Sequence, residues 1–232
     1  MTKLFAIGDL HMSETQEKPM SVFGKQWEGH IERIEENWKR KVSAQDIVII
    51  PGDISWAMQL TQAMLDLNRV ATWPGKKVLL RGNHDYWWSS IAKIRKALPA
   101  DLFAIQNDAL LIDDVVIGGT RGWTLPFEGV PFSAEDDKIL KRELLRLEIS
   151  LHKMMAMPQA KKRVVALHFP PTNQAGDATP FTTLLQQYPI DHVVYGHLHG
   201  NGIHNGFTGE IGGVQYHLTS CDALQFTPLL ID

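Results

Sequence analysis

Short runs of apolar residues recur along the chain, and polar residues end each run abruptly. The runs consist almost entirely of Val, Ile, Leu, Ala and Phe, without the alternation that marks a half-exposed strand. Continuous apolar runs of this length are typical of strands that are covered on both faces. The pattern therefore predicts buried strands at residues 3–7, 46–50, 76–80, 163–167 and 192–195.

Between these strands, apolar residues recur with the period of a helix. Such patterns run from Trp27 to Val42, from Leu60 to Val70 and from Ile139 to Leu151. Ser133 is a candidate N-cap for the third helix, and Pro158 lies near its end. Alternation of strand and helix in the first hundred residues indicates βαβ units with right-handed crossovers.

The second half of the chain has a different pattern, in which strands follow one another more often than they alternate with helices. Residues 110–119 predict a hairpin that turns at Asp113 and Asp114, and further strands are expected within 210–220 and 226–231. Mixed sheets follow from this pattern. Because neither a linker nor an internal repeat interrupts the chain, we predict a single α/β domain over residues 1–232.

Composition and charge narrow the class of protein. Of 232 residues, 44% are hydrophobic and 21% are charged, so a sizeable core is expected. A net charge of −3 gives no general basic field, which argues against electrostatic binding of long nucleic acid. A single cysteine suits a reducing compartment. Without a signal peptide or a membrane span, we expect a cytoplasmic protein, while the oligomeric state is not indicated.

The polar residues that end the strands are unusual in type. Carboxyl ends of strands converge on one crevice in open α/β sheets, and extended backbone points residues two apart to the same side. A single Gly-Asp pair is most often a turn, and a single histidine is usually structural or exposed. Packing does not explain all five segments together: Gly8-Asp9-Leu10-His11, Gly52-Asp53, Gly82-Asn83-His84-Asp85, His168 and Gly196-His197-Leu198-His199.

This series resembles the calcineurin-like metallophosphoesterase family. All five segments are present in order over residues 8–199, so the resemblance covers most of the chain. It implies two packed mixed β-sheets flanked by helices, as a four-layer αββα sandwich, with a two-metal site. The implied ligands are Asp9, His11 and His199 for one ion, Asn83, His168 and His197 for the other, and Asp53 as the bridge between them.

The same resemblance implies a hydrolytic mechanism. Two divalent ions carry more positive charge than Asp9, Asp53 and a bridging hydroxide neutralise, so an anionic phosphoryl group is favoured. The metal-held hydroxide would attack phosphorus. His84 would lie beside the metals without ligating and protonate the leaving group, and Asp85 would accept a hydrogen bond that orients the His84 ring. The mixed N and O donors suit Mn²⁺, Fe, Zn²⁺, Ni²⁺ or Co²⁺ better than Ca²⁺.

Several other features have two readings. Arg121 could hold a substrate phosphate or be an ordinary loop arginine, and His204 could line the pocket. Residues 12–26, 120–132 and 170–181 lack periodicity, so each is either a solvated loop or part of the rim of the site. The same choice, between packing and stacking on a substrate ring, applies to four tryptophans: Trp56, Trp87, Trp88 and Trp123.

These observations together predict a binuclear metal-dependent phosphoesterase that acts on a small phosphorylated substrate. A phosphodiester or nucleotide is slightly preferred to a phosphomonoester, because no large inserted domain closes the cleft. A phosphoprotein (Ser/Thr) phosphatase is the alternative. A non-catalytic scaffold that keeps the fold is disfavoured, because every expected ligand and the Asn83-His84-Asp85 segment are present.

Overall fold

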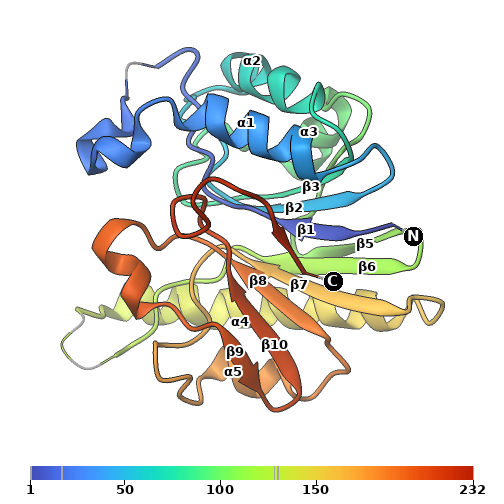
Figure 1. The fold of residues 1–232 in the computed structure, drawn as a ribbon. Helices are drawn as coiled ribbons and strands as arrows, with labels where there is room; N and C mark the ends of the chain where they lie inside the picture. The colour runs from blue at the N-terminus through green and yellow to red at the C-terminus, as the bar shows by residue number, and fades with distance from the viewer. Residues whose placement is uncertain (1, 17, 128, 130, 232) are drawn as a thin grey trace.

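Two β-sheets form the centre of the molecule (Figure 1). The structure is a computed structural model that describes the chain except for residues 1, 17, 128, 130 and 232. The first sheet has the order β11-β1-β2-β3-β4, in which all neighbours are parallel except the β11–β1 pair. Its strands are β1 (Leu4–Ala6), β2 (Ile47–Pro51), β3 (Lys76–Leu80), β4 (Leu102–Ala104) and β11 (Leu229–Leu230).

The second sheet has the order β5-β6-β7-β8-β10-β9 and is mixed. β6, β7, β8 and β10 run parallel, whereas β5 and β9 are antiparallel to their neighbours. The predicted hairpin is confirmed, with its turn at Asp113 and Asp114 between β5 and β6. The strands are β5 (Asp108–Ile112), β6 (Val115–Thr120), β7 (Lys162–Leu167), β8 (His192–Tyr195), β9 (Gly209–Ile211) and β10 (Val214–Leu218).

Helices cover the outer face of each sheet (Figure 1). The first sheet carries α1 (His30–Lys41), α2 (Leu60–Ala71) and α3 (Ile91–Ala97), and the second carries α4 (Ala134–Met155) and α5 (Pro180–Leu185). The predicted helices are confirmed, except that Trp27 lies in the short 3₁₀ helix η2 (Lys25–Trp27). Gly29 separates η2 from α1, because its left-handed backbone (φ 62°) interrupts the helical path.

Three buried apolar clusters fill the spaces between these layers. One lies between α1–α3 and the first sheet, and includes Trp38, Val48 and Leu67. Another, with Ile49, Val78 and Val164, lies between the two sheets. The third packs α4 and α5 on the second sheet, around Leu147 and Val165. Both faces of each sheet are therefore covered, and the four-layer αββα sandwich is confirmed.

Ser133 begins α4 as the sequence predicts. Its hydroxyl accepts a hydrogen bond from the N–H of Asp136 (3.1 Å), and the Asp136 carboxylate accepts one from the N–H of Ser133 (2.8 Å). This reciprocal capping box satisfies two helix-terminal donors, and a cap of this kind stabilises a helix by about 1 kcal/mol.

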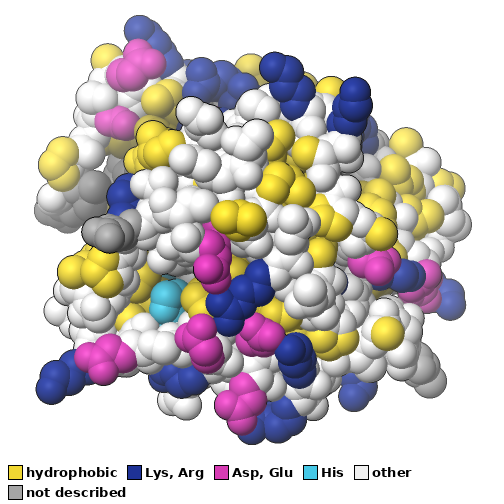
Figure 2. Space-filling view, turned by 90° about the horizontal axis from the view of Figure 1, so that it is seen from above, with side chains coloured by type: hydrophobic (Ala, Val, Ile, Leu, Met, Phe, Trp, Pro, Cys, Tyr) yellow, Lys and Arg dark blue, Asp and Glu magenta, His cyan; other side chains and the backbone are white. Residues whose placement is uncertain are grey.

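The surface over α1 and α2 carries side chains of both charges next to one another (Figure 2). α1 itself carries Glu32, Arg33, Glu35 and Glu36 in its first two turns and Lys39, Arg40 and Lys41 in its last turn. This face therefore lacks a large field of one sign. Within the described residues, no helix has the length and apolar composition needed to cross a membrane.

Candidate metal centre

Strands from both sheets end at one place, and the polar residues that follow them meet there. Asp9 and His11 follow β1, Asp53 follows β2, and Asn83 follows β3. From the second sheet, His168 follows β7, and His197 and His199 follow β8. The site therefore lies where the carboxyl ends of five parallel strands come together, as expected for a binding crevice in an α/β sandwich.

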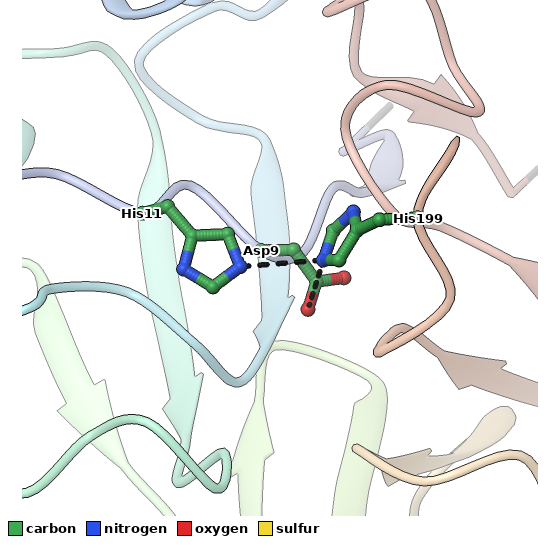
Figure 3. A group of neighbouring side chains, drawn as sticks. All are labelled: Asp9, His11 and His199. Atoms are coloured by element: carbon green, nitrogen blue, oxygen red, sulfur yellow. Dashed lines mark hydrogen bonds and ion pairs between the residues drawn. The ribbon is translucent and has the colours of Figure 1, made fainter. Parts of the chain in front are cut away.

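Asp9, His11 and His199 form one compact group of donors. One atom of each lies within 4.8 Å of the others. His11 Nε2 is 3.2 Å from His199 Nε2, and His199 Nε2 is 3.5 Å from Asp9 Oδ1. Figure 3 shows one nitrogen of each ring pointing toward the other, beside the carboxylate. Asp9 and His11 are buried, so a cation shared by these atoms suits the arrangement better than water does.

Asp53, His168 and His197 form a second group of the same kind. The side-chain oxygen of Asn83 completes it, at 2.6 Å from His168 Nε2 and 2.9 Å from His197 Nδ1. These two nitrogens are 3.3 Å apart. Two imidazoles, an amide oxygen and a carboxylate thus converge on a single point, which is a donor set suited to a divalent transition metal.

Asp53 lies between the two groups. Its Oδ2 atom is 3.5 Å from His168 Nε2 and 3.8 Å from His11 Nε2. Its Oδ1 atom accepts a hydrogen bond from the backbone N–H of His84 (2.8 Å). One oxygen of the carboxylate is therefore held by the protein, and the other faces donors of both groups.

Hydrogen bonds on the far side of the rings fix which nitrogen faces the centre. His168 Nδ1 lies 3.0 Å from the carbonyl oxygen of Pro51, and His199 Nδ1 lies 2.9 Å from Asp222 Oδ1. Asp222 also accepts a hydrogen bond from the N–H of Gly200 (2.9 Å). Such partners orient histidine ligands and raise their basicity. Sequence reasoning missed Asp222, although it follows a strand as the other site residues do.

Several site residues have a left-handed backbone. The φ angles are 58° at Asp9, 46° at His11, 51° at Asp53 and 75° at His197. We expected that an extended backbone would point Asp9 and His11 to the same side. The two side chains do meet, but the backbone between them is not extended, so the expected cause was wrong. Non-glycine residues adopt this region at a cost and concentrate at functional sites.

Two glycines make room for the carboxylates. A Cβ atom at Gly82 would overlap Asp53 Oδ1, and one at Gly196 would overlap Asp9 Oδ2. A larger residue at either position would displace a carboxylate from the centre. The glycines that end the strands are therefore required by close packing against the site.

Charge within the centre favours bound cations. Burial raises the pKa of Asp53, and the nearby Asp9 carboxylate raises it further. Burial is also the main cause that lowers the pKa of His11, His168 and His197, which keeps these rings neutral. His199 differs, because Asp9 and Asp222 outweigh burial and raise its pKa to about 10. Burial thus disfavours the charged form of the Asp53 carboxylate, and bound divalent ions would stabilise that form.

His84 lies at the edge of the centre. Its half-buried ring is 4.5 Å from the ring of Trp56 and 5.9 Å from that of His11, measured between centroids. Its Nδ1 atom is 3.5 Å from the hydroxyl of Tyr86. The ring thus lies beside the two donor groups, and neither group includes it.

Asp85 does not orient the ring of His84, so that prediction was wrong. The Asp85 carboxylate is buried and turned away from His84, toward backbone and indole donors. It accepts hydrogen bonds from the N–H groups of Ile54, Ser55 and Gly82 and from Nε1 of Trp87. Asp85 therefore stabilises the two loops that carry Asp53 and Asn83. Burial raises its pKa to about 6, and Asp53 contributes.

The tryptophans divide by position. Trp87 and Trp88 are buried in the core, so packing is their role. Trp56 stacks on His11, with centroids 4.8 Å apart and planes at 20°. Trp123 packs on Phe169 (5.2 Å between centroids). None of the four contributes an atom to the donor groups.

Arg121 and His204 have different surroundings. The Arg121 guanidinium is half-buried, lies 4.6 Å from the ring centre of Trp123, and has no carboxylate within ion-pair distance among the described residues. His204 is exposed in the 3₁₀ helix η3 (Gly200–Asn205). His204 is not among the residues that line the cavity beside this helix, whereas its neighbour Asn205 is.

A cavity of about 730 Å³ opens beside His197. Residues 124–127 and 172–175 line it, so two of the three aperiodic segments do form the rim of the site. Positions 128 and 130 of the first segment lie outside the described residues. In the third segment, 12–26, residue 17 lies outside the described residues, and Lys18 Nζ is 4.6 Å from the ring centre of Trp56.

Comparisons with known proteins agree with this geometry. The family model described as calcineurin-like phosphoesterase matches residues 2–201. Among solved structures, the phosphopantetheinyl hydrolase of Mycobacterium tuberculosis has a TM-score of 0.54 at 16% identity, covering 100% of this chain and 96% of that one. A protein of unknown function from Aquifex aeolicus, AQ665, has a TM-score of 0.50 at 12% identity, covering 99% and 95%. Curated proteins gave no match.

Proposed function

Because the chain belongs to the calcineurin-like phosphoesterase family, we propose that it hydrolyses a small phosphoester with two divalent metal ions bound on either side of Asp53. The observation that supports this proposal most directly is the pair of adjoining donor groups at one crevice. Family membership supports a metal-dependent phosphoester hydrolase in general. The geometry of the two donor groups supports, in addition, a specific place for the phosphoryl group, between them.

The residues that would hold the metals are those gathered at the strand ends. Asp9, His11 and His199 would bind one ion, Asn83, His168 and His197 the other, and Asp53 both. When bound, such ions acidify a water molecule and neutralise phosphoryl oxygens. The nitrogen and oxygen donors suit Mn²⁺, Fe, Zn²⁺, Ni²⁺ or Co²⁺.

His84 would act as the proton donor to the leaving oxygen. Its ring lies next to the His11 group and belongs to neither donor group. In hydrolysis, the oxygen of water joins phosphorus, the bond from phosphorus to the leaving oxygen breaks, and that oxygen takes a proton from the imidazole. The imidazole regains a proton from the water consumed. General acid assistance of this kind contributes about 10²–10⁴-fold.

Arg121 would hold a non-reacting phosphoryl oxygen. Its half-buried guanidinium has no carboxylate partner among the described residues, and its positive charge partly offsets the burial that raises the pKa of Asp53. An unpaired, partly buried guanidinium next to an expected anion site is suited to bidentate contact with phosphate.

The substrate we propose is small and organic, with a phosphodiester or nucleotide preferred. The cavity beside His197 offers room for an organic substituent next to the phosphoryl site. A neighbour in fold is named a phosphopantetheinyl hydrolase, which is consistent with an ester of a small molecule.

The experiment is a comparison of substrates on metal-depleted protein. Chelated enzyme would be assayed with bis(p-nitrophenyl) phosphate and p-nitrophenyl phosphate, before and after Mn²⁺ is added. We expect hydrolysis only with metal, and faster on the diester. Faster hydrolysis of the monoester would remove the diester preference. Activity confined to a phosphopeptide would assign a phosphoprotein phosphatase, and inactivity with every metal and substrate would contradict the proposal.

A further inference from the structure

The cavity beside His197 is built from three separate segments. Residues Thr124 to Phe127 form one wall, Phe169 to Asp177 form most of another, and Leu198 and Asn205 close it. His197, which belongs to the second donor group, is itself part of the lining. With a volume of about 730 Å³, the cavity is large enough for a substituent the size of a nucleoside.

The described residues of the lining are mostly apolar or neutral and polar, and they include no lysine or arginine. Phe127 and Phe169 supply rings, and Thr124, Gln174 and Asn205 supply neutral polar groups. Among the described residues, the one carboxylate of this lining is Asp177, which accepts a hydrogen bond from Asn173 Nδ2 (2.7 Å). A second phosphate or a carboxylate would find no cation here and would meet Asp177. An uncharged group with apolar surface matches this lining.

The cavity and His84 lie on different sides of the centre. The ring of His84 is next to His11 and Trp56. The cavity instead reaches His197, whose ring is 4.3 Å from Phe169 and 5.0 Å from His168. A phosphodiester has two organic substituents, so the one that leaves beside His84 and the one that stays on phosphorus would meet different surroundings.

We propose that this cavity binds the uncharged substituent of a phosphodiester that remains on phosphorus after hydrolysis. This inference rests on the proposed function and on the assignment of His84 as proton donor. Water supplies the new oxygen on phosphorus, the ester bond on the His84 side breaks, and the leaving alcohol takes the proton. The product that remains in the cavity is a phosphomonoester of the retained group.

The experiment keeps the leaving group constant and changes only the retained substituent. Methyl, hexyl and 5-carboxypentyl p-nitrophenyl phosphates would be assayed with Mn²⁺-loaded enzyme. Burial of the longer uncharged chain is expected to lower KM roughly tenfold or more relative to methyl. The carboxypentyl ester should lose most of this gain, because the lining offers its carboxylate no cation.

Variants of the cavity give the decisive measurement. Phe127→Ala should raise KM for the hexyl ester toward the methyl value and leave the methyl ester nearly unchanged. Gln174→Ala, at an exposed loop position, is the second variant should Phe127→Ala fail to fold. Leu145→Ala, an exposed apolar residue of α4 that does not line the cavity, is the matched control.

The possible failures are separable. If the methyl ester is not hydrolysed, the proposed function itself is contradicted. If the methyl ester is hydrolysed and KM does not depend on the retained group, the assignment of the cavity is overturned. The same holds if both cavity variants show the same dependence on the retained group as the wild type.

Discussion

The backbone N–H of His84 donates a 2.8 Å hydrogen bond to Oδ1 of Asp53. That bond leaves Asp53 Oδ2 facing His168 Nε2 at 3.5 Å and His11 Nε2 at 3.8 Å. The loop that carries the proposed proton donor therefore also orients the carboxylate that faces donors of both groups. Gly82, which begins this loop, packs directly on Asp53.

Gly82→Ala should therefore weaken metal binding in both groups. The added methyl would overlap Asp53 Oδ1 and the backbone nitrogen of Asp53, so either the carboxylate or the loop must move. Gly202→Ala is a matched control, because the closest atom to its Cβ would be Leu198 Cδ2 at 4.0 Å. Metal content by plasma mass spectrometry is expected to fall only in Gly82→Ala. Full metal content with wild-type activity in that variant would contradict the packing argument.

His84→Ala should affect substrates according to their leaving group. Loss of a proton donor is expected to cost about 10²–10⁴-fold on an alkyl phosphodiester, whose alkoxide leaves poorly, and much less on a p-nitrophenyl ester. Metal content should stay at the wild-type value, because the imidazole belongs to neither donor group. His204→Ala, at an exposed histidine, controls for the substitution itself. An equal loss on both esters would reject the proton-donor role.

Asp222→Ala should lower metal affinity without removing a ligand. The Asp222 carboxylate holds His199 Nδ1 at 2.9 Å and also accepts from the N–H of Gly200, so it fixes how His199 Nε2 is presented. Loss of such a partner typically weakens metal binding about 10- to 100-fold. Titration of metal-depleted protein with Mn²⁺ would measure the change. Asp114→Ala removes a turn carboxylate that pairs with Lys161 and should keep wild-type affinity.

Arg121→Ala should reduce kcat/KM while leaving metal content unchanged. A hydrogen bond to a charged group contributes about 1.5–3 kcal/mol, so the loss is expected to be roughly 10- to 100-fold. Arg163→Ala is the control, because Arg163 is half-buried like Arg121 but lies at the start of β7, at the opposite end of that strand from His168. Equal effects of the two substitutions would mean that Arg121 does not contact substrate.

The sequence predicted most of the fold because each of its signals is local. Continuous apolar strands, the Ser133 cap and the turn at Asp113 all depend on neighbouring residues. The grouping of the donors was predicted from the family resemblance and from their place at strand ends. What the sequence could not give was the direction of side chains in left-handed loops, such as those at Asp9 and His11.

Hydrogen bonds between residues far apart in the sequence were the other feature that could not be predicted. Asp85 seemed placed to orient His84 because the two are adjacent in sequence. Its carboxylate instead accepts from Ile54 and Ser55, about thirty residues away along the chain. Asp222 lies 23 residues from His199, and no local pattern connects them. Both contacts result from the packing of strands, which a single sequence encodes only indirectly.

The last prediction concerns stability away from the metal centre. His217 Nε2 in β10 lies 3.2 Å from His192 Nδ1 in the adjacent strand β8. Burial, followed by the charge of His192, lowers the pKa of His217 to about 4. An unfolded histidine has a pKa of about 6.5, so between about pH 6.5 and 4 the unfolded chain binds a proton that the folded chain does not. The neutral His217 of the folded chain therefore contributes fully to the free energy of unfolding above about pH 6.5. This contribution is lost progressively as the pH falls toward 4.

His217→Gln removes this proton uptake, so its free energy of unfolding should fall less steeply between pH 7 and pH 5 than that of the wild type. Urea denaturation at several pH values would measure both slopes. His204→Gln, at an exposed position, controls for the loss of a histidine as such. If the slope in His217→Gln equals the wild-type slope, the β8–β10 histidine pair does not contribute to the acid sensitivity of the fold.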